Sequence, residues 1–436
     1  MKKKFNPPAG VWLIVCLALS ACSRLNPAPS PSALPSTATP HSATAAATGL
    51  TLSPTPALTR GTIRIWHSWD EAQIPALLQI IDDFHAQYPD VQFDVLYVPI
   101  EDLRSRYETA VREGGGPSIL LGPASWGPPL YDAGLLSDLS ADMDARLLDS
   151  LNPAALGAGR YKGALIGLPY ALQGVVLYRN ALIVPEAPET FDSLVSDAHF
   201  ATRGETVGAV LERGFLYSGG DLISLGGQVM DENGNPAFNN ERGLAWIQLL
   251  QTFEQVGPTE LNSDQDLELF KLGKVGFIID GTWNMNDLSQ ALGPGNLAVD
   301  PWPTYDQNGA HYHLSGFVQS DQLYLSPLAQ GDSREASLKF IAYFLSPDVQ
   351  ASLAEAGRIP AALGFPVKDS LIEQAMQALA GGVTYPPLPE METYTAPMNA
   401  ALKTVFDGQT SPSKALQSAQ DNIQEALDQF HATPTP

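Results

Sequence analysis

The chain has 436 residues, a net charge of −23 and two cysteines. This length exceeds what one ordinary hydrophobic core holds, so we expect two folded lobes. The negative charge argues against nucleic acid or an anionic membrane surface as a direct partner, because either would repel the protein.

The N-terminus has the pattern of a bacterial export signal. Three lysines at positions 2–4 precede the apolar run 11–19, which is too short to span a membrane as a helix. The sequence Leu-Ser-Ala-Cys, ending at Cys22, follows this run and resembles a lipobox, in which the cysteine carries a lipid and becomes the first mature residue. We therefore expect residues 1–22 to be a lipoprotein signal peptide and Cys22 to be the lipidation site. A plain signal peptide with a chance cysteine is the alternative.

Removal of this leader leaves no partner for a disulfide. The only other cysteine, Cys16, lies within the leader, so the stability of the fold must come from core burial. The three lysines are lost as well, and the net charge becomes −26.

Residues 23–60 have the composition of a disordered, partly extended tether. Of these 38 residues, 28 are Pro, Ser, Thr or Ala, and none is acidic. A lipid at one end and a folded body at the other predict an exported domain. We expect it at the outer face of the cell membrane, or on the periplasmic side.

Residues 61–126 follow the strand–helix–strand–helix–strand pattern of a parallel sheet. We expect three strands and two helices, at 62–66, 70–88, 91–95, 101–113 and 118–121. Trp69 and Asp70 follow the first strand, and Asp70 is a candidate cap for the first helix. Trp126 lies just past the third strand. The pattern predicts an α/β fold.

Further strands, hairpins and helices are expected in the middle and at the end of the chain. Residues 231–235 have the sequence of a hairpin turn, and residues 175–178 read as a strand. Apolar residues at helical spacing predict helices at 241–256, 333–344, 347–356, 395–406 and 412–430.

The stretch 269–288 has the features of a ligand site. Val275 to Ile279 is a short apolar run with β-branched residues, which predicts a buried strand. Gly281 permits an unusual backbone angle directly after it, and Trp283 follows. Open α/β sheets bind ligands at the carboxyl ends of their strands, so Trp283 is a candidate ligand-facing residue. A core strand followed by an incidental tryptophan is the alternative.

Five stretches of this chain occur together in the order and with the spacing of a known family. They are 65–69, 167–180, 226–239, 273–283 and 346–361. Together they resemble the family 1 extracellular solute-binding proteins of bacterial ABC transporters, the maltose-type sugar-binding proteins. The resemblance covers roughly residues 61–430.

The resemblance implies a two-lobe, periplasmic-binding-protein-like α/β fold with a ligand cleft between the lobes. By this analogy, residues 61–168 and about 303–355 form the first lobe. Residues 169–302 and about 356–432 form the second lobe. Candidate crossings between the lobes are 169–170, 301–303 and 357–358, whose Pro and Gly residues suit hinge closure around a ligand.

The resemblance also implies which residues bind the ligand. A sugar ring offers an apolar face for an aromatic side chain and hydroxyls for carboxylates and amides. The candidates are Trp283, Trp69, Asp70, Trp126, Gln173, Tyr217 and Arg358. Around residues 214–221 the bulky aromatics of the maltose pattern are replaced by Ser-Gly-Gly, which argues against a long maltodextrin site.

The expected function is that of a monomeric substrate-binding lipoprotein of an ABC importer. It would capture a mono- or oligosaccharide and deliver it to the permease subunits in the membrane. A secreted carbohydrate-active hydrolase and a sugar sensor that reports to a membrane kinase are the alternatives.

We expect neither catalysis nor a cofactor nor a metal. The sequence lacks a Walker loop, a His-Glu-x-x-His helix and a Gly-x-Ser-x-Gly elbow. His311 and His313 form a His-x-His pair, for which metal binding is the alternative. They follow an Asn-Gly turn, so we interpret them as a hairpin edge.

Overall fold

The computed structural model describes residues 59–432, except residues 70, 72 and 262. The expected signal peptide, Cys22, most of the expected tether and Asp70 lie outside the described residues. None of the helices in the described part combines the length and the apolar character that a membrane span needs.

The first part of the described chain folds as a parallel sheet with flanking helices, as its sequence pattern predicts. Its elements are β1 (Gly61–His67), α1 (Ile74–Gln87), β2 (Val91–Tyr97), α2 (Ile100–Arg112) and β3 (Ile119–Pro123). β1 lies between β2 and β3 and pairs in parallel with both. Helix α1 begins later than expected, and Gln73 rather than Asp70 is at its N-cap position.

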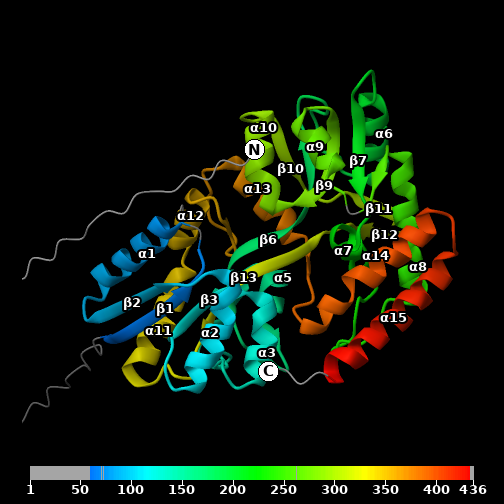
Figure 1. Cartoon of the computed structure of the whole chain (residues 1–436). Coiled ribbons are helices and arrows are strands. Elements are labelled where there is room, and N and C mark those ends of the chain that lie inside the picture. The colour runs from blue at the N-terminus through cyan, green and yellow to red at the C-terminus, as the bar shows by residue number, and fades with distance from the viewer. Residues whose placement is uncertain (1–58, 70, 72, 262, 433–436) are drawn as a thin grey trace, which may run out of the picture. The chain divides into compact units, whose positions relative to one another are not determined.

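Two long strands connect this sheet to the rest of the molecule. They are β6 (Leu168–Asn180) and β13 (Phe317–Leu325). They pair in antiparallel fashion, and β13 also pairs with β3 in the first lobe. Figure 1 shows them side by side in the centre of the molecule. The sheet is therefore continuous from one lobe into the other.

The second half of β6 carries the sheet of the second lobe. The other strands of this sheet are β7 (Val207–Glu212), β8 (Thr259–Glu260), β9 (Val275–Gly281) and β10 (Leu297–Asp300). β9 and β10 are antiparallel to β6, whereas β7 pairs with both β9 and β8 in parallel. The expected buried strand at 275–279 is confirmed, since every residue of β9 is buried.

Helices cover both lobes. Around the first lobe lie α3 (Gly127–Asp132), α4 (Ala145–Asp149), α5 (Pro153–Ala158), α11 (Gly331–Phe344) and α12 (Pro347–Glu355). The helices of the second lobe are α6 (Phe191–Ala201), α7 (Phe215–Ser224), α8 (Glu241–Thr252), α9 (Gln265–Lys271), α10 (Met285–Leu292), α13 (Ser370–Ala380), α14 (Thr395–Phe406) and α15 (Pro412–Ala432).

The hydrophobic residues gather in separate cores on the two sides of the crossing strands. One core contains residues of β1, α1, β3, α11 and α12. Another contains residues of α7, α8, α14 and α15 together with Phe277 of β9. This arrangement is a two-lobe α/β fold.

A hairpin precedes β13 in the chain. It consists of β11 (Thr304–Gln307) and β12 (Ala310–His313), so the expected hairpin edge with His311 and His313 is confirmed. Tyr305 and Tyr312 of this hairpin pack against the core of the second lobe. The chain therefore returns to the first lobe along β13 and not directly after residues 301–303.

Candidate functional site

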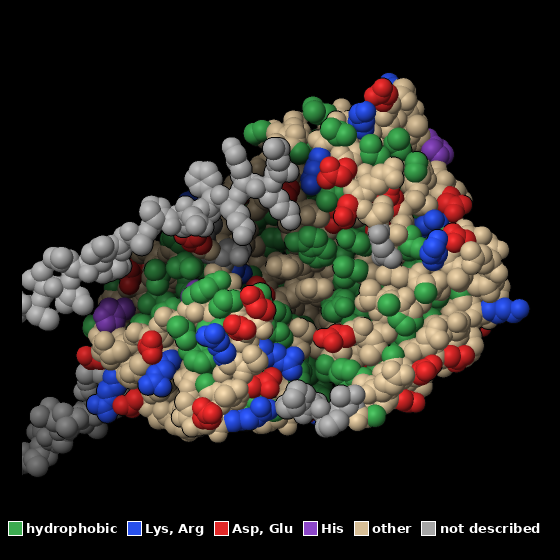
Figure 2. All heavy atoms as spheres, viewed as in Figure 1, with side chains coloured by type: hydrophobic (Ala, Val, Ile, Leu, Met, Phe, Trp, Pro, Cys, Tyr) green, Lys and Arg blue, Asp and Glu red, His purple; other side chains and the backbone are tan. Residues whose placement is uncertain are grey.

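A cavity of about 500 Å³ lies where the crossing strands meet the carboxyl ends of β1, β3 and β9. Its floor is formed by residues 171–173 of β6 and 319–321 of β13. Figure 2 shows a deep hollow in this face of the molecule. A cavity of this size, lined from two lobes, is typical of a small-molecule binding site.

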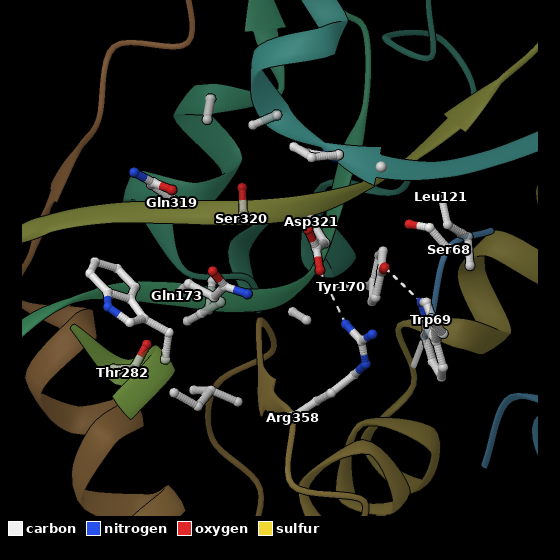
Figure 3. Close-up of a pocket in the computed structure, with 18 of the residues that line it drawn as sticks. Ser68, Trp69, Leu121, Tyr170, Gln173, Thr282, Gln319, Ser320, Asp321 and Arg358 are labelled. Atoms are coloured by element: carbon white, nitrogen blue, oxygen red, sulfur yellow. Dashed lines mark hydrogen bonds and ion pairs between the residues drawn. The ribbon is translucent and has the colours of Figure 1, made fainter. Parts of the chain in front are cut away.

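Arg358 is held in the wall of this cavity by three contacts. One guanidinium nitrogen donates to Asp321 Oδ2 at 3.1 Å, and a second donates to Gln73 Oε1 at 2.7 Å. The guanidinium lies 4.1 Å from the ring centroid of Trp69, which is within cation–π distance. Figure 3 shows Arg358 pointing toward Asp321 on β13. Burial raises the pKa of Asp321, and the charge of Arg358 opposes that shift.

Trp69 lines the cavity, but other side chains cover its ring. It is 2% exposed and stacks on Tyr170, with ring centroids 5.8 Å apart. Its Nε1 donates to the Tyr170 hydroxyl at 2.9 Å, and the ring of Phe344 meets it edge-on. Little of the indole is therefore left for a ligand.

His67 fixes the turn that carries Trp69. Its Nδ1 accepts a hydrogen bond from the Trp69 backbone N–H at 3.1 Å. Burial, and secondarily the charge of Arg358, lower the pKa of His67 to about 4. His67 is therefore uncharged at neutral pH, which the acceptor role of Nδ1 requires.

Trp283 is the exposed aromatic side chain of the cavity wall. It lies on the short 3₁₀ helix Thr282–Asn284 directly after β9 and is 43% exposed. A Cβ at Gly281 would overlap the indole, so the glycine allows the ring to lie back against the end of the strand. Thr282 Oγ1 accepts from the Gly174 backbone N–H at 3.1 Å, which ties this turn to β6.

Amides and hydroxyls provide the polar surface of the floor. Gln173 on β6 and Gln319 on β13 are direct partners in the strand register. Ser320 and Asp321 follow Gln319 along β13, and Figure 3 shows these side chains around the cavity. Such groups exchange hydrogen bonds with hydroxyl-rich ligands.

Two of the candidates lie outside the cavity lining. Trp126 packs beside the core under α2 and α3, and a Cβ at Gly122 would overlap its ring. Tyr217 packs against the core of the second lobe. Burial, and then the nearby carboxylate of Asp280, raise the pKa of Tyr217. Of the candidates, Trp283, Trp69, Gln173 and Arg358 line the cavity.

The cavity is also lined by residues that were not predicted from the sequence, among them Gln319, Ser320, Asp321 and Tyr385. The first three belong to a run of four polar residues, 319–322, between the apolar ends of β13, and that interruption of an apolar strand is the signal that marks them. For Tyr385 the sequence gives no comparable signal.

The charges of the cavity wall are balanced. Among its described residues, Asp321 and Arg358 are the only charged ones, and they pair with each other. Glycoside hydrolysis uses a pair of carboxyl groups across the substrate, whereas one carboxylate is found among these residues. In the described ranges, no group of three or more His, Cys, Asp or Glu side chains is arranged to hold a metal ion.

Comparison with known proteins identifies a family and several relatives by sequence. The family model of the bacterial extracellular solute-binding protein matches residues 79–378. The maltotriose-binding protein of Pyrococcus abyssi is 24% identical over 310 residues, which are 69% of this chain and 66% of that protein. The galactooligosaccharide-binding protein of Bacillus subtilis is 25% identical over 370 residues, covering 79% of this chain and 85% of that protein.

Solved structures share the fold. An extracellular solute-binding protein from Staphylococcus aureus in complex with maltose superposes with a TM-score of 0.75 and 21% identity. The match covers 85% of this chain and 98% of that one. A cyclo/maltodextrin-binding protein complexed with maltotetraose superposes with a TM-score of 0.73 and 23% identity, covering 84% and 97%.

Proposed function

Because the chain belongs to the family of bacterial extracellular solute-binding proteins, we propose that it captures a mono- or oligosaccharide in the cleft between its lobes and delivers it to the permease of an ABC importer. The relatives named above bind maltotriose or galactooligosaccharides, which supports a sugar as the ligand.

The observation that carries this proposal is the position of Trp283 across a floor of amides. An exposed indole suits the apolar face of a sugar ring. The side-chain amides of Gln173 and Gln319 can donate hydrogen bonds to the sugar hydroxyls and accept hydrogen bonds from them. Arg358 and Asp321 neutralise each other, which favours an uncharged ligand over a sugar phosphate.

The two crossing strands suit closure of the lobes around the ligand. A ligand that contacts both lobes stabilises the closed form. The division implied by the resemblance has residues 61–168 and about 303–355 in the first lobe and residues 169–302 and about 356–432 in the second. We propose this division with one change, at the return near residue 303. The packing of the β11–β12 hairpin moves the proposed return to the first lobe into β13.

The location that fits this function is the outer face of the cell membrane or the periplasmic side. A lipid on Cys22 would anchor the chain, residues 23–60 would act as the tether, and the protein would act as a monomer. A pneumococcal relative, 25% identical over 343 residues, is named as a solute-binding lipoprotein of an ABC transporter. The relatives are named as binding proteins, and we propose that this chain likewise does not hydrolyse its ligand.

A thermal-shift screen of the purified full chain tests the proposal. The ligands tested include mono- and oligosaccharides, sugar phosphates and amino acids. At a hundredfold excess over Kd, a ligand that binds only the folded state stabilises it by about 2.7 kcal/mol. We expect a saturable increase in Tm with a neutral saccharide. We also expect that saccharide to be recovered unhydrolysed after long incubation with the protein. A response to non-sugar solutes alone would contradict the sugar assignment, and hydrolysis would favour the enzyme alternative.

A further inference from the structure

Trp283 lies in the turn 280–284, whose two ends are joined by side chains. Asp280 belongs to the end of β9, and Asn284 is the last residue of the 3₁₀ helix that follows. The Asn284 side-chain amide donates to the Asp280 carboxylate, with Nδ2 3.2 Å from Oδ1 and 3.1 Å from Oδ2. Asp280 Oδ1 also accepts from the Gly281 backbone N–H. The carboxylate thus binds one residue on each side of the tryptophan.

The two joined side chains are not themselves part of the cavity wall. Among the described residues that line the cavity, this turn contributes Thr282 and Trp283. Asp280 is 5% exposed, and Asn284 is half-buried. Any effect of Asp280 or Asn284 on a ligand in the cavity must therefore be transmitted through the residues between them.

Other side-chain contacts hold the first half of the turn. The hydroxyl of Tyr178 on β6 donates to the Gly281 carbonyl oxygen at 3.0 Å. Thr282 Oγ1 accepts from the backbone N–H of Gly174, which also belongs to β6. Both contacts fix residues that precede the indole in the chain, so they leave the residue after it to be held by another contact.

The second half of the turn depends on Asn284. The backbone contributes one hydrogen bond, from the Met285 N–H to the Thr282 carbonyl oxygen. A single 3₁₀ turn is marginal by itself, because one bond of poor geometry offsets little of the entropy lost on ordering it. The amide of Asn284 adds a side-chain tie to β9, whose residues are all buried.

The surroundings of Asp280 are unfavourable for a carboxylate. Burial raises the pKa of Asp280, and the hydrogen bonds from Gly281 and Asn284 oppose that shift. The negative charges of Asp264 and Glu212 raise the pKa further. A buried carboxylate beside other acids costs stability, so what Asp280 contributes lies in the hydrogen bonds that it accepts from the turn.

From this geometry we propose that Asp280 and Asn284 are positioning residues of the sugar site, and that their contact holds the exposed indole of Trp283 in the orientation that a saccharide ring requires. The inference rests on the proposed function and adds to it two residues that act without touching the ligand. When the contact is broken, the turn samples several orientations. The ligand then has to order the indole, which lowers its affinity.

Calorimetric titration of the full chain measures the effect on affinity. The probe is maltotriose, or a galactotriose if maltotriose does not bind. We expect Asn284→Ala and Asp280→Ala each to lower the affinity about tenfold. The double variant should lose no more than either single variant, because both substitutions break the same contact. Additive losses, or wild-type affinity in Asn284→Ala, would overturn the inference.

Asn296→Ala is the matched control for Asn284→Ala. Asn296 is a half-buried asparagine of the same lobe outside the cavity lining, and its Nδ2 donates to the Leu292 carbonyl oxygen at 2.7 Å. Its substitution removes a side-chain hydrogen bond of the same kind without changing the turn of Trp283. We expect this variant to bind the saccharide like wild type.

A conservative variant separates positioning from a loss of stability. In Asp280→Asn the amide oxygen can still accept from Gly281, and the amide nitrogen can donate to the oxygen of a rotated Asn284 side chain. We therefore expect Asp280→Asn to regain most of the affinity that Asp280→Ala loses. If the affinity simply followed the Tm of each variant, Asn296→Ala included, the two residues would have a structural role only.

Fluorine NMR of the ligand-free full chain, labelled with fluorotryptophan, observes the indole directly. The resonance of Trp283 is assigned by its absence in Trp283→Phe. We expect Asn284→Ala to shift or broaden this resonance and Asn296→Ala to leave it unchanged. An unchanged resonance in Asn284→Ala would overturn the inference.

The failure of this inference is distinguishable from failure of the proposed function. If no saccharide binds to wild type, the sugar assignment fails, and the fluorine spectra still decide whether the contact positions Trp283. If the saccharide binds and Asn284→Ala changes neither the spectrum nor the affinity, the function stands and the positioning role does not.

Discussion

The guanidinium of Arg358 lies over the ring of Trp69, 4.1 Å from its centroid. Asp321 and Gln73 hold the same guanidinium by hydrogen bonds. The Arg358 guanidinium is thus held in place before any ligand binds, and the ring of Trp69 packs against it. Preorganised polar groups lose little conformational entropy when a ligand binds.

Removing the partner of Arg358 should destabilise the first lobe. Asp321→Asn leaves the largely buried cation without a counter-charge. Because the Asp321 side chain is 25% exposed, we expect the free energy of unfolding to fall by about 3 kcal/mol, at the low end for a buried pair. Denaturant unfolding measures this. The control is Asp407→Asn, which breaks the exposed pair between Lys403 and Asp407 and should cost less than about 1 kcal/mol. Equal losses in the two variants would contradict the importance of the buried pair.

Gly281 should be essential for the position of Trp283. Its backbone angles are φ −85° and ψ 150°, which alanine adopts without strain, but the added Cβ would overlap the indole. We expect Gly281→Ala to shift the tryptophan emission and to weaken saccharide binding at least about tenfold. Gly115→Ala is the control, since a Cβ there meets one atom at 3.6 Å. Unchanged emission and affinity in Gly281→Ala would show that the position of the Trp283 indole does not depend on the glycine.

Asp221 should make the protein less stable as the pH rises. It is 1% exposed on α7, one oxygen accepts from the Ser315 N–H at 3.2 Å, and burial raises its pKa to about 8. The folded state keeps this proton up to about pH 8, whereas the unfolded chain releases it near pH 4. Between these values the folded state binds more protons, so stability falls with rising pH, in total by on the order of 5 kcal/mol.

Asp221→Asn removes this titration and keeps an oxygen for the Ser315 N–H. We expect the variant to gain stability over wild type progressively from pH 4 to pH 8, as followed by Tm. Parallel pH profiles of the two proteins would contradict a protonated Asp221.

His67 should have the opposite pH effect. Its pKa is lowered to about 4 in the folded state, against 6.5 in the unfolded chain. The unfolded state therefore binds more protons between these values, and stability falls as the pH drops from about 6.5 to 4, by about 3 kcal/mol. His67→Asn retains a side-chain acceptor without the titration. We expect its Tm to be less sensitive to pH in this window, and an equally steep profile would argue against a neutral His67.

The sequence predicts those parts of the structure that local patterns determine. The alternation of strands and helices in the first lobe and the strand before Trp283 follow from the periodicity of apolar residues. The unusual backbone angle expected at Gly281 is wrong: its backbone is extended, and a glycine is needed there because a Cβ would overlap the indole of Trp283. β13 is not predicted from the sequence, because four consecutive polar residues, 319–322, interrupt its apolar pattern, and three of them line the cavity.

Long-range contacts of the site could not be read from the sequence. The pairing of Arg358 with Trp69 depends on how the chain returns after β13, and the position of Tyr385 depends on pairing with β13. Trp126 follows a strand end much as Trp283 does, yet it packs beside the core under α2 and α3 instead of lining the cavity. Which strand-end tryptophan faces the cleft is decided by packing that local sequence does not encode.

The measurement that tests the account most directly is a saccharide titration of wild type, Trp283→Ala and Trp126→Ala, followed by calorimetry. We expect a neutral saccharide to bind wild type saturably and Trp283→Ala to lower the affinity at least about tenfold. Trp126→Ala, once its melting curve shows that it is folded, should bind like wild type. Equal affinity of Trp283→Ala and wild type would contradict the assignment of this cavity as the sugar site.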